Sequence, residues 1–380
     1  MKSCFKTRSL VQLGAALALS TAFATAAFAA GPQIVAGPGA EPECFKPVSA
    51  DTKYFQWPAK KGPYRIALVN GFIANDWRVQ MIKVAKAYAN QDSVKSDLKD
   101  FKVVSVGQDV AAQIAAVNNF IDQGYDAIIV DANSSTAFGS VVKKANDAGV
   151  VLLSFDNIID DPNNIEVNVD QRGLGVTAGN FLLKETTANP ANFLFVRGPA
   201  GQPVDLARAD GFAEAIAKSG RKVNVTEVIG NWAAGDGQKV TADAIAAGGK
   251  FDAIYVEGGS QGAAQAMLDA GKFIVPMSGE DENAFRMLCN ANHDKGMHCQ
   301  SGGTGPAQSS VTIKTAIAAL KGEKIPQNIA LPTSISFSPY KEGVEVFPKL
   351  PGSLYTGNNF PACKIGFTNE EIAAQSGENN

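Results

Sequence analysis

From Tyr64 onward, short runs of apolar and β-branched residues alternate with longer stretches whose apolar positions recur with the period of a helix. The first series predicts strands over residues 65–70, 101–106, 127–131 and 150–155. The helices between them are expected over residues 77–89, 110–122 and 137–148. Because these strands are apolar on both sides and are separated by helices, they predict a parallel sheet covered on both faces.

A second series with the same architecture follows the irregular stretch 157–163. Its strands are expected over residues 193–196, 223–228, 253–257 and 273–277. Its helices are expected over residues 204–218, 238–247 and 262–270, and one more helix over 307–320 precedes a Pro-rich tail. The chain is long enough for two hydrophobic cores, so the predicted fold class is α/β with two doubly wound parallel-sheet lobes.

The expected division of the chain has five parts. They are a signal peptide (1–29), an N-terminal extension (30–63), an N-terminal lobe (64–168 plus 301–324), a C-terminal lobe (169–300), and a returning strand with the C-terminal tail (325–380).

The first 30 residues have the composition of a secretory signal peptide. A basic region (Lys2, Lys6, Arg8) precedes an apolar run over 10–22 and the small-residue cleavage site Ala27-Phe28-Ala29. We therefore expect cleavage near Ala29 and export to the periplasm. Removal of three cations and no acids changes the formal net charge from -3 to -3 - 3 = -6, which argues against nucleic acid as a partner. No later apolar stretch reaches the roughly 18 to 20 residues that cross a bilayer.

Four cysteines follow the predicted cleavage site: Cys44, Cys289, Cys299 and Cys363. An even count in an oxidising compartment predicts disulfides, and three connectivities are possible. We expect a local Cys289–Cys299 bond, and a Cys44–Cys363 bond that ties the N-terminal extension to the tail. A zinc site is the alternative, because His293 and His298 lie between Cys289 and Cys299 in the sequence. The spacing of these four residues matches none of the usual zinc motifs, and we expect no metal.

Residues at the carboxyl ends of the predicted strands are the candidates for chemistry, because open parallel sheets bind ligands there. Amides and carboxylates dominate this set, with a guanidinium and two indoles beside them. Such groups pair with neighbouring hydroxyls, and indole faces stack on sugar rings, so a sugar or polyol fits best. The residues expected to bind it are Asn75, Asp76, Trp77, Asp131, Asp156, Asn157, Asp205, Arg208, Trp232, Gly258, Glu280 and Gln300. Further strand-end residues are Asn70, Asn133, Ser134, Gln202, Glu257, Gly259 and Asp281.

Each of these residues also has a simpler explanation. Asp and Asn at a strand-to-helix junction are most often helix N-caps, and Asp109 is expected to be only that. The indoles of Trp77 and Trp232 could equally be ordinary core side chains.

A secreted serine hydrolase is the competing functional interpretation. Gly258-Gly259-Ser260-Gln261-Gly262 matches the Gly-x-Ser-x-Gly pattern between a strand and a helix, so Ser260 could be a nucleophile. The chain has two histidines, and both lie within 38 residues of Ser260 beside the predicted local disulfide, with no sheet strand between acid and base. That spacing argues against a catalytic triad. Phosphate-binding and calcium-binding loop motifs do not occur, and we expect no cofactor and no enzymatic activity.

The chain resembles the periplasmic substrate-binding proteins of bacterial ABC importers, of the ribose and galactose type, over residues 64–324. The segments that carry the resemblance are 126–137, 148–157, Asn168-Val169-Asp170 with Gly173 and Gly179, Arg197 to Gly201, and Arg208 to Phe212. The resemblance implies a type I periplasmic-binding-protein-like fold, in which a hinge joins the two lobes. Its partners would be a small sugar or polyol and an ABC permease in the inner membrane, and we expect a monomer.

The resemblance also implies roles for individual residues. Trp77 matches the ring-stacking aromatic, Asp156 the hydroxyl-binding carboxylate, and Arg208 the ligand-binding arginine. Glu280 lies near an acidic ligand residue of the family, and Gln300 near a glutamine at the second crossing between lobes. Two departures put ribose itself in doubt: ribose-type proteins carry Asp-Arg at Asp156-Asn157, and Asn-Asp at Gly258-Gly259.

Overall fold

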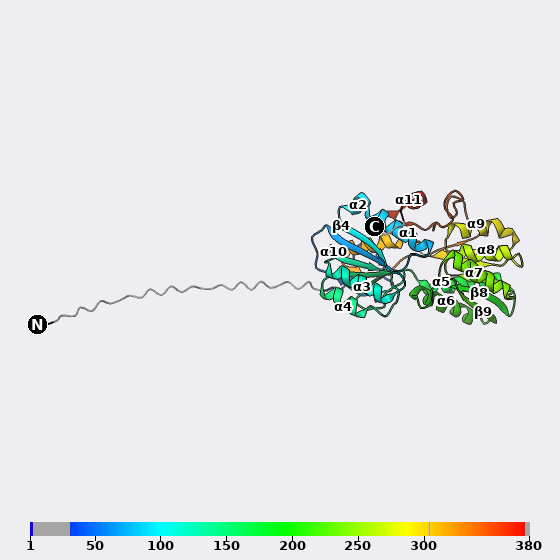
Figure 1. Ribbon diagram of the computed structural model, residues 1–380, viewed down its shortest axis with the longest axis horizontal. Helices are drawn as coiled ribbons and strands as arrows, with labels where there is room; N and C mark the ends of the chain where they lie inside the picture. The colour runs from blue at the N-terminus through cyan, green and yellow to red at the C-terminus, as the bar shows by residue number, and fades with distance from the viewer. Residues whose placement is uncertain (3–30, 304, 377–380) are drawn as a thin grey trace.

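The computed structural model describes residues 1–2, 31–303 and 305–376 and contains two lobes side by side (Figure 1). The predicted signal peptide lies outside the described residues, apart from its first two. Within the described chain, none of the helices is both long enough and apolar enough to cross a membrane.

The N-terminal lobe is built on a six-stranded sheet in which all neighbouring strands are parallel. Its strand order is β14 (Asn328–Ala330), β7 (Ile165–Asn168), β6 (Val151–Phe155), β5 (Ala127–Val130), β3 (Tyr64–Asn70) and β4 (Leu98–Ser105). One face is covered by α1 (Asp76–Ala89) and α10 (Gln308–Leu320), and the other by α3 (Val110–Asp122) and α4 (Gly139–Asp147). Alternate residues of β3 enter the two cores, which is why residues 66–69 are all apolar.

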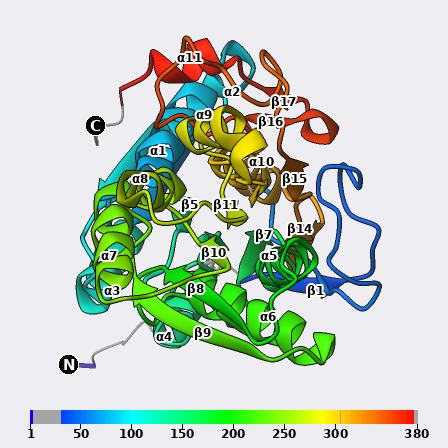
Figure 2. The same ribbon diagram turned by 90° about the vertical axis from the view of Figure 1, so that its right-hand side faces the viewer.

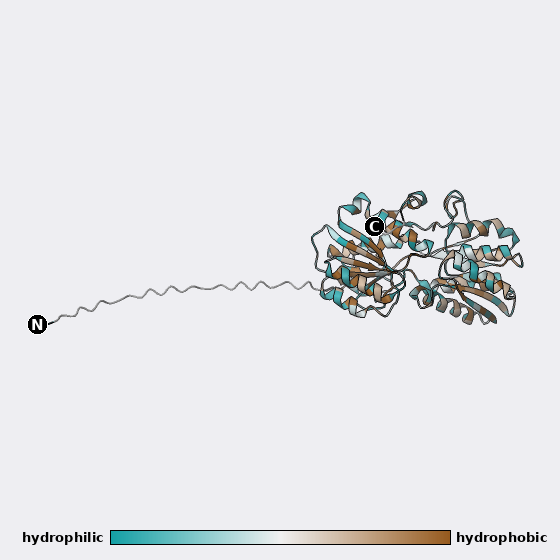
Figure 3. Cartoon of the chain, viewed as in Figure 1, coloured by the Kyte–Doolittle hydropathy of each residue, from teal (hydrophilic) through white to brown (hydrophobic). Residues whose placement is uncertain are grey.

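The C-terminal lobe repeats this arrangement, with one antiparallel strand at an edge. Its strand order is β15 (Ser334–Phe337), β12 (Cys299–Gly303), β11 (Met277–Gly279), β10 (Ala253–Val256), β8 (Ala191–Arg197) and β9 (Val223–Ile229). The covering helices are α5 (Gln171–Glu185) and α6 (Pro203–Ser219) on one face, and α7 (Ala234–Ala246), α8 (Ser260–Ala270) and α9 (Asn283–Asn292) on the other. In both lobes the strands are the most apolar segments and the outer helices carry the polar positions (Figure 3).

Smaller elements surround the lobes. They are a three-stranded sheet of β1 (Gln33–Val35), β2 (Tyr54–Gln56) and β13 (Ile325–Pro326), the short helix α2 (Asp92–Lys95), the pair β16 (Asn359–Phe360) and β17 (Ile365–Gly366), and α11 (Asn369–Ala373). Figure 2 shows α11 above α1, on the side of the molecule away from β9.

Three segments connect the sheets of the two lobes: β7 to α5, β12 to α10, and β14 to β15. The tail then makes a fourth passage between the lobes. Tyr340 and Val346 pack in the core of the C-terminal lobe, whereas Phe360 and Ile372 pack in the core of the N-terminal lobe. The expected single returning strand is therefore two strands, one in each sheet.

Both predicted disulfides are present. Cys44 is bonded to Cys363, with 4.5 Å between the Cα atoms, and Cys289 is bonded to Cys299. The first bond fixes the tail to the N-terminal extension, and the second joins α9 to β12. Since all four sulfurs are bonded in pairs, no thiolate remains at these positions for the zinc site considered above.

The structure differs from the sequence prediction at several places, and β7, α9 and β12 are among the elements that were not predicted. The predicted strand over 273–277 begins only at Met277, because Pro276 has no N–H for the strand ladder. Helix α5 was not predicted, since glycines weaken its helical pattern. Those glycines let α5 lie close to α6: a Cβ on Gly175 would come within 2.0 Å of the carbonyl oxygen of Arg208.

Candidate ligand-binding site

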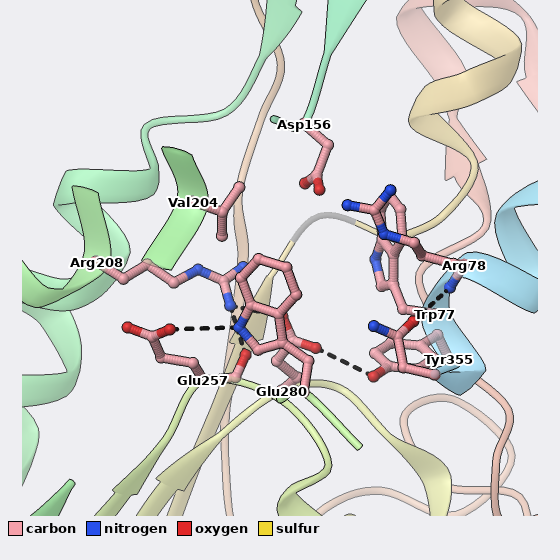
Figure 4. Close-up of a pocket in the computed structure, with 10 residues that line it drawn as sticks. Trp77, Arg78, Asp156, Val204, Arg208, Glu257, Glu280 and Tyr355 are labelled. Atoms are coloured by element: carbon pink, nitrogen blue, oxygen red, sulfur yellow. Dashed lines mark hydrogen bonds and ion pairs between the residues drawn. The ribbon is translucent and has the colours of Figure 1, made fainter. Parts of the chain in front are cut away.

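A cavity lies between the lobes, at the carboxyl ends of both sheets. Its walls come from the loops and first helical turns that follow the strands, and from the tail. The residues that line it are Asn75, Trp77, Arg78, Asp156, Val204, Arg208, Trp232, Glu257, Glu280 and Tyr355. Figure 4 shows the carboxylate of Asp156 entering from one side and those of Glu257 and Glu280 from the opposite side.

Arg78 anchors the wall formed by the N-terminal lobe. Asn75 caps α1 by accepting a hydrogen bond from the backbone N–H of Arg78, which sets the direction of the first helical turn. The guanidinium pairs with Asp131 at 2.7 Å and donates to Asn70 Oδ1 at 2.6 Å. It also lies over the ring of Phe72. Because Arg78 is 1% exposed and Asp131 is fully buried, this pair is a fixed part of the wall.

Asp156 follows β6 with a left-handed backbone (φ 55°) that turns its side chain toward the cavity. It accepts hydrogen bonds from Gln171 at 3.3 Å and Gln308 at 3.1 Å, the first residues of the helices that follow two of the crossings. Asn157 donates to Asp156 and to Asp131. The position of Asp156 is therefore coupled to the segments about which the lobes would move.

Arg208 has the corresponding place in the C-terminal lobe. Its guanidinium pairs with Glu280 at 2.7 Å, donates to the backbone oxygen of Glu257 at 2.6 Å, and donates to Gln171 at 2.9 Å. Glu257 follows β10 and accepts from the N–H of Gly198 and from the indole of Trp232. Both donors bind one oxygen of Glu257, Oε2, and the carboxyl of Glu257 also lies beside that of Asp205.

The two lobes supply these groups from equivalent strands. In the two strand orders, β5 corresponds to β10 and β6 to β11. Asp131 and Glu257 follow the first pair, and Asp156 and Glu280 follow the second. Each lobe thus contributes two carboxyl groups from matched positions, together with one arginine from the helix after another matched strand, α1 after β3 and α6 after β8.

Aromatic side chains form the apolar part of the site. Trp77 and Trp232 line the cavity, and Trp232 stacks against Phe72 of the other lobe with 6.4 Å between ring centroids. Two glycines make room for the indole of Trp232. A Cβ on Gly198 would lie 2.2 Å from the indole ring, and one on Gly258 would lie 3.0 Å from its Cβ.

The tail contributes Tyr355, which is 2% exposed. Its backbone N–H donates to Gln80 of α1, and its hydroxyl lies 3.1 Å from Glu280 and 3.2 Å from Glu282. One hydroxyl proton can be donated to only one of two carboxylates. Both contacts can therefore be hydrogen bonds only when one of the two glutamates is protonated and donates to the tyrosine oxygen.

Burial shifts the titration of the carboxyl groups upward. It raises the pKa of Asp131 and of Glu280 to about 7, although the guanidinium beside each group opposes the shift. Burial also raises the pKa of Asp156, and raises that of Glu257 well above its ordinary value with the help of the nearby Asp205. The carboxyl groups in and around the cavity therefore outnumber the two guanidinium groups, those of Arg78 and Arg208, that could neutralise them.

Six of the twelve predicted ligand-binding residues line the cavity: Asn75, Trp77, Asp156, Arg208, Trp232 and Glu280. The other six lie behind or beside them. Asp131 pairs with Arg78, Asn157 donates to Asp156, and Gly258 leaves room for Trp232. Asp205 pairs with Arg197, and Gln300 accepts a hydrogen bond from Ser278. Asp76 borders a separate hollow against the tail.

Four lining residues were not among those predictions: Arg78, Val204, Glu257 and Tyr355. Glu257 stood at a predicted strand end, so the sequence already contained a signal for it. Arg78 and Val204 are in first helical turns, just beyond the loops considered. Tyr355 had no local signal, because its place depends on how the tail packs.

Ser260 does not have the environment of a nucleophile. Its hydroxyl accepts the backbone N–H of Glu280 at 3.0 Å, and the residue is fully buried. Neither histidine is seen to hydrogen-bond to Ser260 in the described chain: His293 Nδ1 bonds Ser338, and His298 Nδ1 pairs with Glu185. The Gly-x-Ser-x-Gly sequence therefore forms the tight start of α8, with Gly259 in a left-handed conformation.

The chain belongs to the family described as periplasmic binding protein domain, whose model matches residues 66–324. The fold, with two doubly wound lobes around an interlobe cavity, agrees with this assignment.

Among curated proteins, the galactofuranose-binding protein YtfQ of Escherichia coli is 29% identical over 204 residues, which are 51% of this chain and 63% of that protein. The D-ribose/D-allose-binding protein of Pseudomonas aeruginosa is 30% identical over 190 residues, 47% of this chain and 57% of that protein. The matched parts thus span less than two thirds of the length of these two relatives.

Among solved structures, an ABC transporter solute binding protein from Thermobispora bispora is 26% identical with a TM-score of 0.66, covering 72% of this chain and 84% of that one. The crystal structure of a galactofuranose binding protein has a TM-score of 0.63 at 22% identity, covering 71% of this chain and 94% of that one. The second likeness concerns the fold alone.

Proposed function

We propose that this protein is a non-enzymatic, exported solute-binding protein that captures a monosaccharide or polyol between its lobes and delivers it to an ABC permease. The observation that carries the proposal is the polar cavity between the lobes, in which Arg78 Nη2 is buried without a hydrogen-bond partner among the described residues and the carboxyl groups of Asp156, Glu257 and Glu280 face it. Buried polar groups are nearly always satisfied, so an unsatisfied donor in a cavity lined with carboxyl acceptors favours a ligand that both accepts and donates hydrogen bonds.

The lining chemistry supports a polyhydroxylated ligand. Arg208 and Asp156 come from opposite lobes and can take neighbouring hydroxyls from two sides, while Trp77 and Trp232 offer indole faces to the C–H face of a ring. Relatives named for galactofuranose, D-ribose or D-allose, and xylitol point to the same ligand class.

Capture would proceed by hinge closure. Besides the covalent crossings, the lobes meet through the N–H of Val204, which donates to Asn157 at 3.1 Å, and through the contact between Phe72 and Trp232. Gln171 also donates to Asp156, and Tyr355 of the tail bonds residues of both lobes. A ligand that bridges both walls would add to these contacts and favour the closed state. The basic, apolar and small-residue pattern of the N-terminus supports export, and the mass of the mature protein would test cleavage near Ala29.

A thermal-shift screen against sugars and polyols, followed by calorimetry, tests the proposal. We expect a one-site ligand among monosaccharides, pentitols, cyclitols or their amino derivatives. If no compound in these classes raises the melting temperature or gives a binding heat, the proposed function is wrong.

A further inference from the structure

The charge balance of the cavity indicates which kind of polyol it fits. The carboxyl groups within one contact of its walls are Asp131, Asp156, Glu257, Glu280 and Glu282. The only cationic side chains among the described residues that line the cavity are Arg78 and Arg208. Each arginine already has a carboxylate partner at 2.7 Å, Asp131 for Arg78 and Glu280 for Arg208.

Two lining carboxyl groups, Asp156 and Glu257, form no ion pair with the described residues. Neutral amide donors hold Asp156, and a backbone N–H and an indole N–H hold Glu257. Such donors solvate a carboxylate without cancelling its charge. Glu257 is 1% exposed, and the group beside its carboxyl is the carboxyl of Asp205, so no ion pair neutralises its charge in a site shielded from water.

Building on the proposed function, we propose that the natural ligand carries a protonated amine, as an amino sugar or amino polyol does. The ammonium group of the ligand would lie against Glu257 and Asp156, and its three N–H donors would bond to carboxyl oxygens from both lobes. The hydroxyls of the ligand would be taken by the two guanidinium groups. The indoles of Trp77 and Trp232 add to the attraction, because their faces favour cations.

A neutral polyol fits this site less well. Without a cation, the excess carboxyl groups must keep protons in order to remain buried, and the bound state loses a charge-assisted hydrogen bond. With an ammonium ligand the same groups ionise, so binding releases protons to the solvent. The groups that would take part are Asp131, Asp156, Glu257, Glu280 and Glu282. The charged and titratable groups that face them are Arg78, Arg208, Tyr355 and Asp205, which is itself paired with Arg197.

Matched pairs of compounds test the inference by calorimetry. Glucosamine is compared with glucose, galactosamine with galactose, an inosamine with myo-inositol, and a 1-amino-1-deoxypentitol with xylitol. We expect the amino member of the best-binding pair to bind at least about 10-fold tighter than its hydroxyl partner. Repeating that titration at pH 7 in two buffers of different ionisation heat should reveal net proton release for the amine.

Glu257→Gln keeps the shape of the side chain and removes its charge. In this variant the preference for the amine over its hydroxyl partner should fall to about 3-fold or less. Glu185→Gln is the matched control, because it makes the same change on the same lobe at the opposite end of α5 from Gln171, about 21 Å along the helix. It should keep the full preference.

The outcomes separate this inference from the proposed function. A hydroxyl compound that binds as tightly as its amino partner, or a preference that survives Glu257→Gln, overturns the inference and leaves sugar or polyol binding intact. Failure of every compound in all four pairs, together with the wider screen, overturns both.

Discussion

The two lobes build their walls from the same groups at equivalent strands, yet they use them differently. In the N-terminal lobe, Arg78 and Asp131 form a buried ion pair. Of the two carboxyl groups of this lobe, Asp131 and Asp156, only Asp156 lines the cavity. In the C-terminal lobe, Glu257 and Glu280 both line the cavity together with Arg208. We infer from this difference that the N-terminal wall has a fixed structure, whereas the protonation state of the C-terminal wall depends on the bound ligand.

The largest expected effect comes from breaking the pair in the N-terminal lobe. Arg78→Leu leaves Asp131 buried without its cation, and the free energy of unfolding should fall by about 3 to 5 kcal/mol in urea denaturation. Lys239→Ala is the control, since it breaks an exposed pair with Asp243 and should change stability by less than about 0.5 kcal/mol. Equal stability of the two variants would show that Arg78 does not form part of a fixed wall.

In the C-terminal lobe, the main effect should be on binding. Arg208→Ala should weaken ligand affinity by about 30- to 1000-fold, or about 2 to 4 kcal/mol, because ligand groups and Glu280 lose their donor in a dry site. Asp156→Ala should have an effect of similar size from the opposite wall. Calorimetry with the best ligand of the screen measures both. A variant that binds as tightly as the wild type would remove that residue from the site.

The pH dependence of stability should carry a contribution from each lobe. Asp131 and Glu280 have pKa values raised to about 7 in the folded protein, so between their ordinary values and pH 7 the folded state binds more protons than the unfolded state. Their contribution to stability is therefore present at acidic pH and is lost as pH rises through 7. From pH 5 to pH 8 we expect a loss of about 2 kcal/mol or more from these groups. Glu280→Gln should flatten the decline relative to the wild type; an unchanged slope would contradict the shift at this residue.

The smallest expected effect concerns the contact that the tail makes with the acidic wall. Tyr355→Phe removes the hydroxyl that bonds Glu280 and Glu282 but keeps the ring. Ligand affinity should fall by about 3- to 10-fold, corresponding to about 0.7 to 1.4 kcal/mol. Tyr340→Phe, in a tail residue that packs in the core of the same lobe, is the comparison and should leave affinity unchanged. If the two variants bind alike, the tail does not take part in the site.

The lobes were predictable from the sequence because the central strands of each sheet are buried on both faces and are separated by amphipathic helices. The rule that ligands bind at strand ends then located Asp156, Glu280 and Trp77 at the cavity wall. It could not separate lining from supporting residues such as Asp131, because that depends on which neighbour a side chain turns toward. Tyr355 depends on a tail held by a disulfide between residues 319 positions apart, which no local pattern encodes.

The most direct test of the account is a crystal structure of the protein with the best ligand of the screen. The account predicts that the ligand lies in the cavity between the lobes, within hydrogen-bonding distance of Asp156 on one side and of Arg208 on the other, with an indole against its ring or carbon chain. A ligand bound elsewhere on the molecule, or held by one lobe only with the cavity empty, would contradict it.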